Sequence, residues 1–166
     1  MVRDGHLNFI TRKVNMHPLV QKWIEALLSN NYPQGNGCLR NHENKYCCLG
    51  VFCDISGRGK WLQNRGNVSF SFSLGEDEDM SRRFFSNMQL PTHLREEIGM
   101  SDPFMSALMG LNDQDKFTFS EIAYVVKYHW NDTDYVNKLS MRLYTERNNP
   151  VAPAPVDVAP SANSVV

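Results

Sequence analysis

The sequence predicts an α+β fold that is mainly helical and carries a small antiparallel sheet. Apolar residues recur at helical spacing after Pro18 and again through most of the last third of the chain. Residues 37–48 contain two short apolar runs around a polar turn, which is typical of a β-hairpin. Residues 68–74 alternate strictly between apolar residues and serine, which indicates a further strand.

Length and composition predict one domain with polar ends. The chain has 166 residues, of which 42% are hydrophobic, enough to bury one core without metal or disulfide staples. We expect an N-terminal arm over residues 1–17, a single domain over 18–147 and a disordered tail rich in Pro and Ala over 148–166.

Charge and hydropathy exclude two classes of partner. A formal net charge of -1 leaves no excess of Lys and Arg for a phosphate-binding face, so we expect no duplex nucleic acid partner. No apolar run reaches the roughly 18 to 20 residues of a membrane span, and the first residues lack the apolar core of a signal peptide. We therefore expect a cytoplasmic protein without a membrane partner, in which the four cysteines are free thiols.

The first helix is expected over residues 18–29. Pro18 suits a first-turn position, Asn15 or His17 can cap the helix, and Trp23 lies on the apolar stripe as a core anchor. The polar segment 30–37 then reverses the chain into the hairpin, whose strands are 38–40 and 45–47.

A short buried helix follows the hairpin over residues 49–55, closed by the glycine-containing segment 56–59. In the strand at 68–74 we expect the apolar residues on one face and the serines on the other. This strand and the hairpin should form the sheet against the first helix. The acidic run 76–79 is expected to be a solvated loop.

The last third should be helical. A helix over 91–98 is stopped by Gly99, and Asp102-Pro103 provides a cap and first-turn pair for the next helix. Thr118 and Glu121 match a capping box that begins a further helix, and a final helix covers about 132–146.

Residues 20–126 resemble a widespread, largely uncharacterised family of small bacteriophage-encoded proteins. Its distinctive motif is Tyr-Cys-Cys-Leu-Gly-Val-x-Cys-Asp, here at residues 46–54, and the resemblance rests on Trp23, Leu27, Tyr32, Gln34-Gly35, Leu39-Arg40, Tyr46 to Val51, Cys53-Asp54, Leu111-Asn112-Asp113 and Phe119 to Ala123. The resemblance implies a viral gene expressed in a host bacterial cytoplasm. It implies no particular activity.

Three hypotheses compete for the cysteine segment. In the first, Cys48 begins a helix whose positive N-terminal end lowers the thiol pKa, so that Cys48 is a nucleophile. Gln34 or amides near Gly35 and Gly37 would then stabilise an oxyanion, and the base would be His42, His93 or His129.

In the second hypothesis the zinc ligands are Cys38, Cys47, Cys48 and Cys53, and His42 can substitute for one of them. Adjacent cysteines on a strand point to opposite faces, which disfavours this site, and we predict neither a metal nor a cofactor. In the third hypothesis the cysteines are small apolar core residues.

The functional prediction is a phage accessory protein that modulates a host process, with counter-defence as one such process. It would bind a host protein or sequester a small nucleotide-like molecule, with the ligand-binding residues Gln34, Gly35, Gly37, Arg40, Lys45, Tyr46 and Trp61. One alternative is a hydrolase that degrades such a molecule with Cys48 and His42. The other is an interaction protein without a small-molecule site.

Overall fold

The computed structural model describes residues 16–64, 66, 69–74 and 87–148. The α+β prediction is confirmed: the described residues form mostly helix and one three-stranded antiparallel sheet. The elements in chain order are α1 (Pro18–Leu28), β1 (Arg40–Asn41), α2 (Cys48–Ser56), β2 (Lys60–Gln63), β3 (Ser69–Ser73), α3 (Thr92–Glu97), α4 (Asp102–Asp113), α5 (Phe119–Tyr128) and α6 (Thr133–Asn148). Most of the predicted arm, the acidic run 76–79 and the tail after Asn148 lie outside the described residues.

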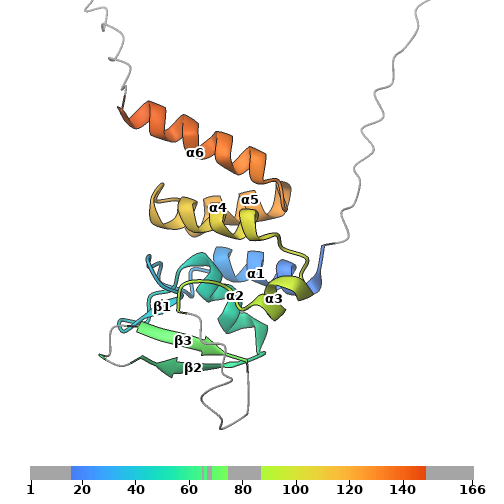
Figure 1. Ribbon diagram of the computed structural model, residues 1–166, viewed down its shortest axis with the longest axis vertical. Helices are drawn as coiled ribbons and strands as arrows, with labels where there is room; N and C mark the ends of the chain where they lie inside the picture. Colours follow the sequence, from blue (N-terminus) through green and yellow to red (C-terminus); the bar gives the residue numbers. More distant parts are fainter. Residues whose placement is uncertain (1–15, 65, 67–68, 75–86, 149–166) are drawn as a thin grey trace, which may run out of the picture.

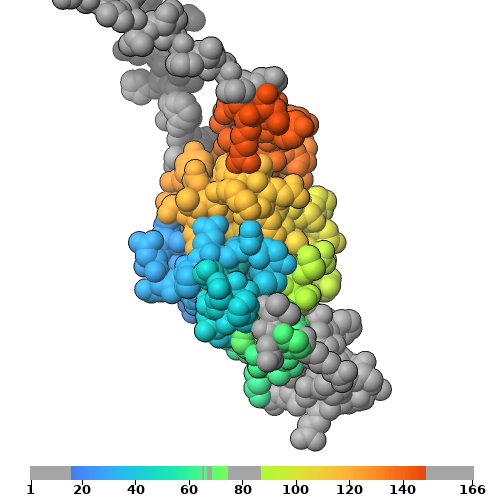
Figure 2. Space-filling view, turned by 90° about the vertical axis from the view of Figure 1, so that its left-hand side faces the viewer, coloured from blue at the N-terminus to red at the C-terminus, as the bar shows by residue number. Residues whose placement is uncertain are grey.

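The elements are stacked in layers from one end of the molecule to the other (Figure 1). The sheet lies at one end and α6 at the opposite end, with α1, α2 and α3 in the layer next to the sheet and α4 and α5 between them and α6. The space-filling view shows the same order of segments from another side (Figure 2). In the middle of the stack, α1 packs against α2 and α5, and α4 packs against α6, α2 and α5.

Helix α1 forms as its sequence predicts. The His17 ring nitrogen Nδ1 accepts the backbone N–H of Leu19 at 3.2 Å, and Pro18 occupies the first turn. The apolar stripe is buried, and the Trp23 ring meets Phe52 of α2 edge-on at 5.4 Å. The prediction that Trp23 is a core anchor is confirmed.

The sheet differs from the prediction in its pairing. The strand predicted over 68–74 is present as β3, but its neighbours are β1 and the unpredicted strand β2, in the order β1-β3-β2. The predicted hairpin is reduced to one antiparallel bridge between Arg40 and Tyr46. Residues 45–47 form no strand because Tyr46 also pairs in parallel with Gln34, which diverts the chain toward α2.

A further expectation about the sheet is wrong. The sheet lies beyond α2 rather than against α1, because α1 turns its apolar stripe to α2 and α5. Both faces of β3 contain buried residues, since Ser71 and Ser73 are buried as well as Phe72. Ser71 can be buried because its hydroxyl donates to Asn64 Oδ1 at 2.6 Å.

The last helices follow their local signals with one correction. Gly99 ends the α3 region with a left-handed backbone, at φ 66°. Ser101, not Asp102, caps α4, since its hydroxyl oxygen accepts the N–H of Phe104 at 3.3 Å. The capping box of Thr118 and Glu121 at the start of α5 is confirmed.

Candidate ligand cleft

Cys48 is a core residue. It is the first residue of α2 and fully buried, with Sγ 3.9 Å from the Leu108 carbonyl oxygen. Burial raises the pKa of the Cys48 thiol well above its ordinary value, so the expectation that the helix N-terminus favours a thiolate is wrong. The desolvation of a fully buried sulfur outweighs the partial charge of the helix end.

Burial also disfavours the thiolate form of the other two core cysteines. Burial raises the pKa of Cys47 to about 12 and that of Cys53 well above its ordinary value. His42 and His93 are exposed, and the His129 ring stacks on Tyr135 at 3.4 Å between ring centres. A solvent-exposed imidazole cannot contact a sulfur that is sealed in the core, so Cys48 and His42 are not brought together as base and nucleophile.

The cysteine segment is instead a centre of structural contacts. The Trp23 indole Nε1 donates to the Cys48 carbonyl oxygen at 2.8 Å, which joins α1 to α2. Gly50 lies so close to the preceding segment that a Cβ atom there would be 1.7 Å from the Leu39 carbonyl oxygen. The motif therefore holds the first half of the chain together.

Asn112 connects this centre to the second half of the chain. Its side chain is almost fully buried at the end of α4. Its Oδ1 accepts the N–H of Cys48 at 3.3 Å and the Gln34 amide at 3.2 Å, and its Nδ2 donates to the Gly35 carbonyl oxygen at 2.9 Å. Asn112 thus caps α2 from another helix and fixes the 34–36 segment.

Gln34 is likewise used for structure. Its Nε2 donates to the Phe117 carbonyl oxygen at 2.6 Å, and its Oε1 accepts the N–H of Phe119, the first residue of α5. The expectation that Gln34 stabilises an oxyanion is wrong, because its donors and acceptor already bind the chain.

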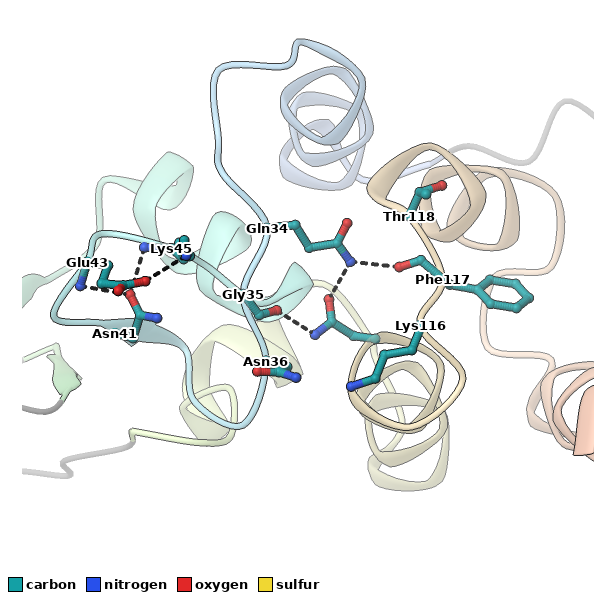
Figure 3. A pocket seen from close by; sticks show the side chains of 10 residues that line it. Gln34, Gly35, Asn36, Asn41, Glu43, Lys45, Lys116, Phe117 and Thr118 are labelled. Atoms are coloured by element: carbon teal, nitrogen blue, oxygen red, sulfur yellow. Dashed lines mark hydrogen bonds and ion pairs between the residues drawn. The ribbon is translucent and has the colours of Figure 1, made fainter.

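A cleft of about 420 Å³ opens beside this network. Three segments line it: residues 34–36, the turn at 41–45, and the connection from α4 to α5 (Figure 3). The lining residues are Gln34, Gly35, Asn36, Asn41, Glu43, Lys45, Asn112, Lys116, Phe117 and Thr118. Its size is within the range of small-molecule sites in proteins, and eight of its ten lining residues have polar side chains.

Two lysines supply the positive charge of the cleft. Lys45 forms an ion pair with Glu43 at 2.6 Å, and both side chains are about half exposed. The Lys116 Nζ donates to the Asp113 carbonyl oxygen at 2.6 Å, and its side chain extends toward Asn36 (Figure 3). Lys116 has a left-handed backbone, at φ 61°, which is uncommon for a residue other than glycine and directs the side chain over the cleft.

The structure divides the predicted ligand-binding residues into two groups. Gln34, Gly35 and Lys45 line the cleft. Arg40, Tyr46 and Trp61 form a separate aromatic cluster, in which the Arg40 guanidinium lies 5.4 Å from the Tyr46 ring centre and 5.5 Å from that of Trp61. Gly37 is not among the lining residues of the cleft, and its φ of 74° fits a turn.

The aromatic cluster is held together by its own polar contacts. Asp54 accepts the Tyr32 hydroxyl and the Trp61 indole N–H, each at 2.8 Å. Burial, together with the Asp54 hydrogen bond, raises the pKa of Tyr32 to about 12. Arg40 also binds Asn44 Oδ1 at 2.7 Å and lies 4.4 Å from the Phe70 ring centre. Arg40 therefore belongs to the aromatic cluster, and it is not among the residues that line the cleft with Lys45.

Sequence reasoning missed the part of the cleft that comes from the second half of the chain. Lys116, Phe117 and Thr118 lie about 80 residues beyond Gln34, and hydrogen bonds of Gln34 and Asn112 bring the two segments together. The Leu-Asn-Asp motif at 111–113 marked the neighbourhood, because Asn112 lies in it. No local pattern identifies Lys116.

Within the described ranges, no group of three or more His, Cys, Asp or Glu side chains is placed to hold a metal ion. The helices in those ranges are all too short or too polar to cross a membrane.

Comparison with known proteins places the chain in a family. Neither the curated proteins nor the solved structures include one that matches the chain. A family model described as a domain of unknown function, DUF8296, matches residues 16–130, which is more than half of the chain and covers α1 to α5. The chain therefore belongs to the DUF8296 family.

Proposed function

We propose that this protein is a bacteriophage accessory protein that binds a small nucleotide-like molecule in the cleft. Through this binding it modulates a host process, such as counter-defence. The observation that carries the proposal is the position of Lys45 and Lys116, which come from distant segments and line the same open cleft beside the Gly35 backbone. Ammonium groups bind phosphate oxygens by charge-assisted hydrogen bonds.

The other lining groups suit the rest of such a molecule. The Asn36 side chain is exposed and can donate to or accept from a ring edge or a hydroxyl. Phe117 lies on the opposite side of the cleft from the 41–45 turn, but its ring points away from the other lining side chains (Figure 3), so we assign the ring no contact with the ligand. Glu43 carries the one carboxylate among the lining residues, and it is already neutralised by Lys45.

The proposal is binding rather than turnover. The cleft lining contains no cysteine or histidine, and the sulfur of Cys48 is enclosed in the core. A protein that sequesters its ligand depletes it stoichiometrically and returns it unchanged on denaturation.

Calorimetric titration with AMP, compared with adenosine, tests the proposal. We expect AMP to bind and adenosine to bind more weakly, because the lysine contacts require the phosphate. Lys45→Ala and Lys116→Ala should each weaken AMP binding about 10- to 100-fold, since a hydrogen bond to a charged group contributes roughly 1.5–3 kcal/mol. Lys22→Ala, a change of an exposed lysine on α1, is the matched control. Equal binding of AMP and adenosine, or no effect of either cleft lysine, would overturn the proposal.

A second candidate, binding of a host protein, is favoured by exposed side chains at the other end of the molecule. Tyr128 of α5 and Met141 and Tyr144 of α6 are each more than half exposed. Exposed aromatic and methionine side chains are enriched in protein interfaces. Capture from a lysate that fails with Tyr128→Ala and Tyr144→Ala but persists with Lys116→Ala would favour this candidate over the cleft.

A further inference from the structure

An apolar groove lies between α5 and α6, and it shares only Phe117 with the lining of the ligand cleft. Its volume is about 380 Å³, and its walls are formed by Phe117, Tyr124, Val125, Tyr135 and Leu139, with Ser120 at the rim. Helix α6 packs mainly against α4, so the side of α6 toward α5 leaves this space open. Tyr124 is 54% exposed although it stands in the apolar wall.

Aromatic contacts fix the groove wall in place. The Tyr135 ring stacks on His129 with 3.4 Å between ring centres and an angle of 3° between the rings. Tyr124 packs against Tyr128 with 4.8 Å between ring centres. A preformed aromatic wall costs little conformational entropy when a ligand binds to it.

The chain continues from α6 with a segment whose composition suits such a groove. Residues 150–160 contain only Pro, Val, Ala and one charged residue, Asp157, and four of the residues are prolines. Proline-rich segments favour the polyproline II conformation and bind grooves lined with aromatic side chains. The groove and the segment both involve sequence beyond residue 130, where the DUF8296 match ends.

The distance is also suitable. Helix α6 ends at Asn148, and the nine residue steps from Leu139 to that end span about 14 Å. A polyproline II segment advances about 3.1 Å per residue, so about five residues cover this distance. A segment of this length is therefore long enough for Pro153, Pro155 and Pro160 to reach the groove.

We propose that residues 150–160 dock into the α5–α6 groove of the same molecule, with proline rings against Tyr124 and Tyr135. The docked segment covers the apolar wall that α6 leaves open. This inference is independent of the ligand proposed for the cleft.

Site-specific photocrosslinking in the full-length protein tests the docking. The photoreactive amino acid p-benzoylphenylalanine is placed at Ser120, which is exposed at the groove rim, or at Gln21, an exposed control position on α1. After irradiation of the purified monomer, mass spectrometry identifies the crosslinked peptides. We expect a crosslink from position 120 to residues 150–160 within one chain and none from position 21.

Two variants make the result specific. Replacing Pro153, Pro155 and Pro160 by serine should abolish the crosslink while leaving the circular dichroism of the helices unchanged. Tyr124→Ala, a change at an exposed position, should also abolish it. The proposal is overturned if position 120 crosslinks only to other segments, if the crosslink joins two molecules, or if the serine variant retains the crosslink.

Discussion

The side chain of Asn112, at the end of α4, accepts the backbone N–H of Cys48, the first residue of α2, at 3.3 Å. The first N–H group of the helix that carries the cysteine motif is therefore bound by a side chain that lies 64 residues away in the sequence. Through the same side chain, Gln34 and Gly35 are held at the edge of the cleft. Asn112 links the folding of the core to the shape of the candidate site.

Asn112→Ala should lower the free energy of unfolding by about 2–4 kcal/mol, because it leaves the Cys48 N–H and the Gly35 carbonyl without their buried partner. Urea denaturation measures the change. Asn36→Ala, an exposed asparagine in the same cleft, should change stability by less than about 0.5 kcal/mol. Equal effects of the two substitutions would contradict a structural role for Asn112.

Gly50→Ala should destabilise the protein by about 3 kcal/mol or more, because the added Cβ would be 1.7 Å from the Leu39 carbonyl oxygen and the backbone must move. Gly110→Ala in α4 is the matched control, since its Cβ would have no neighbour within 4 Å. In the control, alanine should raise stability by about 0.5–1 kcal/mol through its helix propensity. Thermal unfolding of the two variants decides the matter, and a tolerated Gly50→Ala would show that the approach of Leu39 is not tight.

Cys48→Ser should destabilise the fold by about 1–3 kcal/mol, because a hydroxyl would replace a buried thiol in an apolar site. Cys38→Ser, at a half-buried position, should have an effect below about 0.5 kcal/mol. In the native protein at pH 8, a thiol reagent should leave Cys48 unmodified, and it should modify Cys48 once the protein is unfolded. Fast modification of native Cys48 would restore the nucleophile hypothesis.

Stability should fall steeply in alkaline solution. The ordinary pKa of a cysteine thiol is 9.0, and burial raises the pKa of Cys47, Cys48 and Cys53 in the folded protein. Below pH 9.0 the folded and the unfolded chain both keep these protons, so the contribution of the thiols to the free energy of unfolding is fully present. Above it the unfolded chain releases protons that the folded chain retains, which favours unfolding until pH reaches the folded pKa, about 12 for Cys47.

Each of these thiols should lower the free energy of unfolding by about 1.4 kcal/mol per pH unit in that range. Guanidinium titrations at pH 8, 9, 10 and 11 measure the slope. Cys53→Ala removes one of the three thiols and should make the slope shallower by about that amount. A stability that stays constant from pH 9 to pH 11 would show that the thiols are not buried in the folded state.

Local sequence signals determined most of the helices. Pro18 with His17, Gly57 after α2, Gly99 after α3 and the Thr118–Glu121 capping box act within one or two turns, so their effect can be predicted without the rest of the chain. The alternation in 68–74 determined β3 for the same reason. The motif around Cys48 also marked the centre of the core correctly, because apolar residues and cysteines of such density are rarely exposed.

Only the tertiary structure decided how these elements combine. The partner of β3 depends on the position of Tyr46, which hydrogen bonds to the Gln34 segment rather than completing a hairpin with residues 38–40. The pKa of the Cys48 thiol depends on its burial under α4, which cannot be predicted from the local sequence. The effect of this burial on the pKa is larger than that of the helix N-terminus. The cleft exists because Asn112 and Gln34 join segments about 80 residues apart, and contacts between distant segments leave no periodic pattern in the sequence.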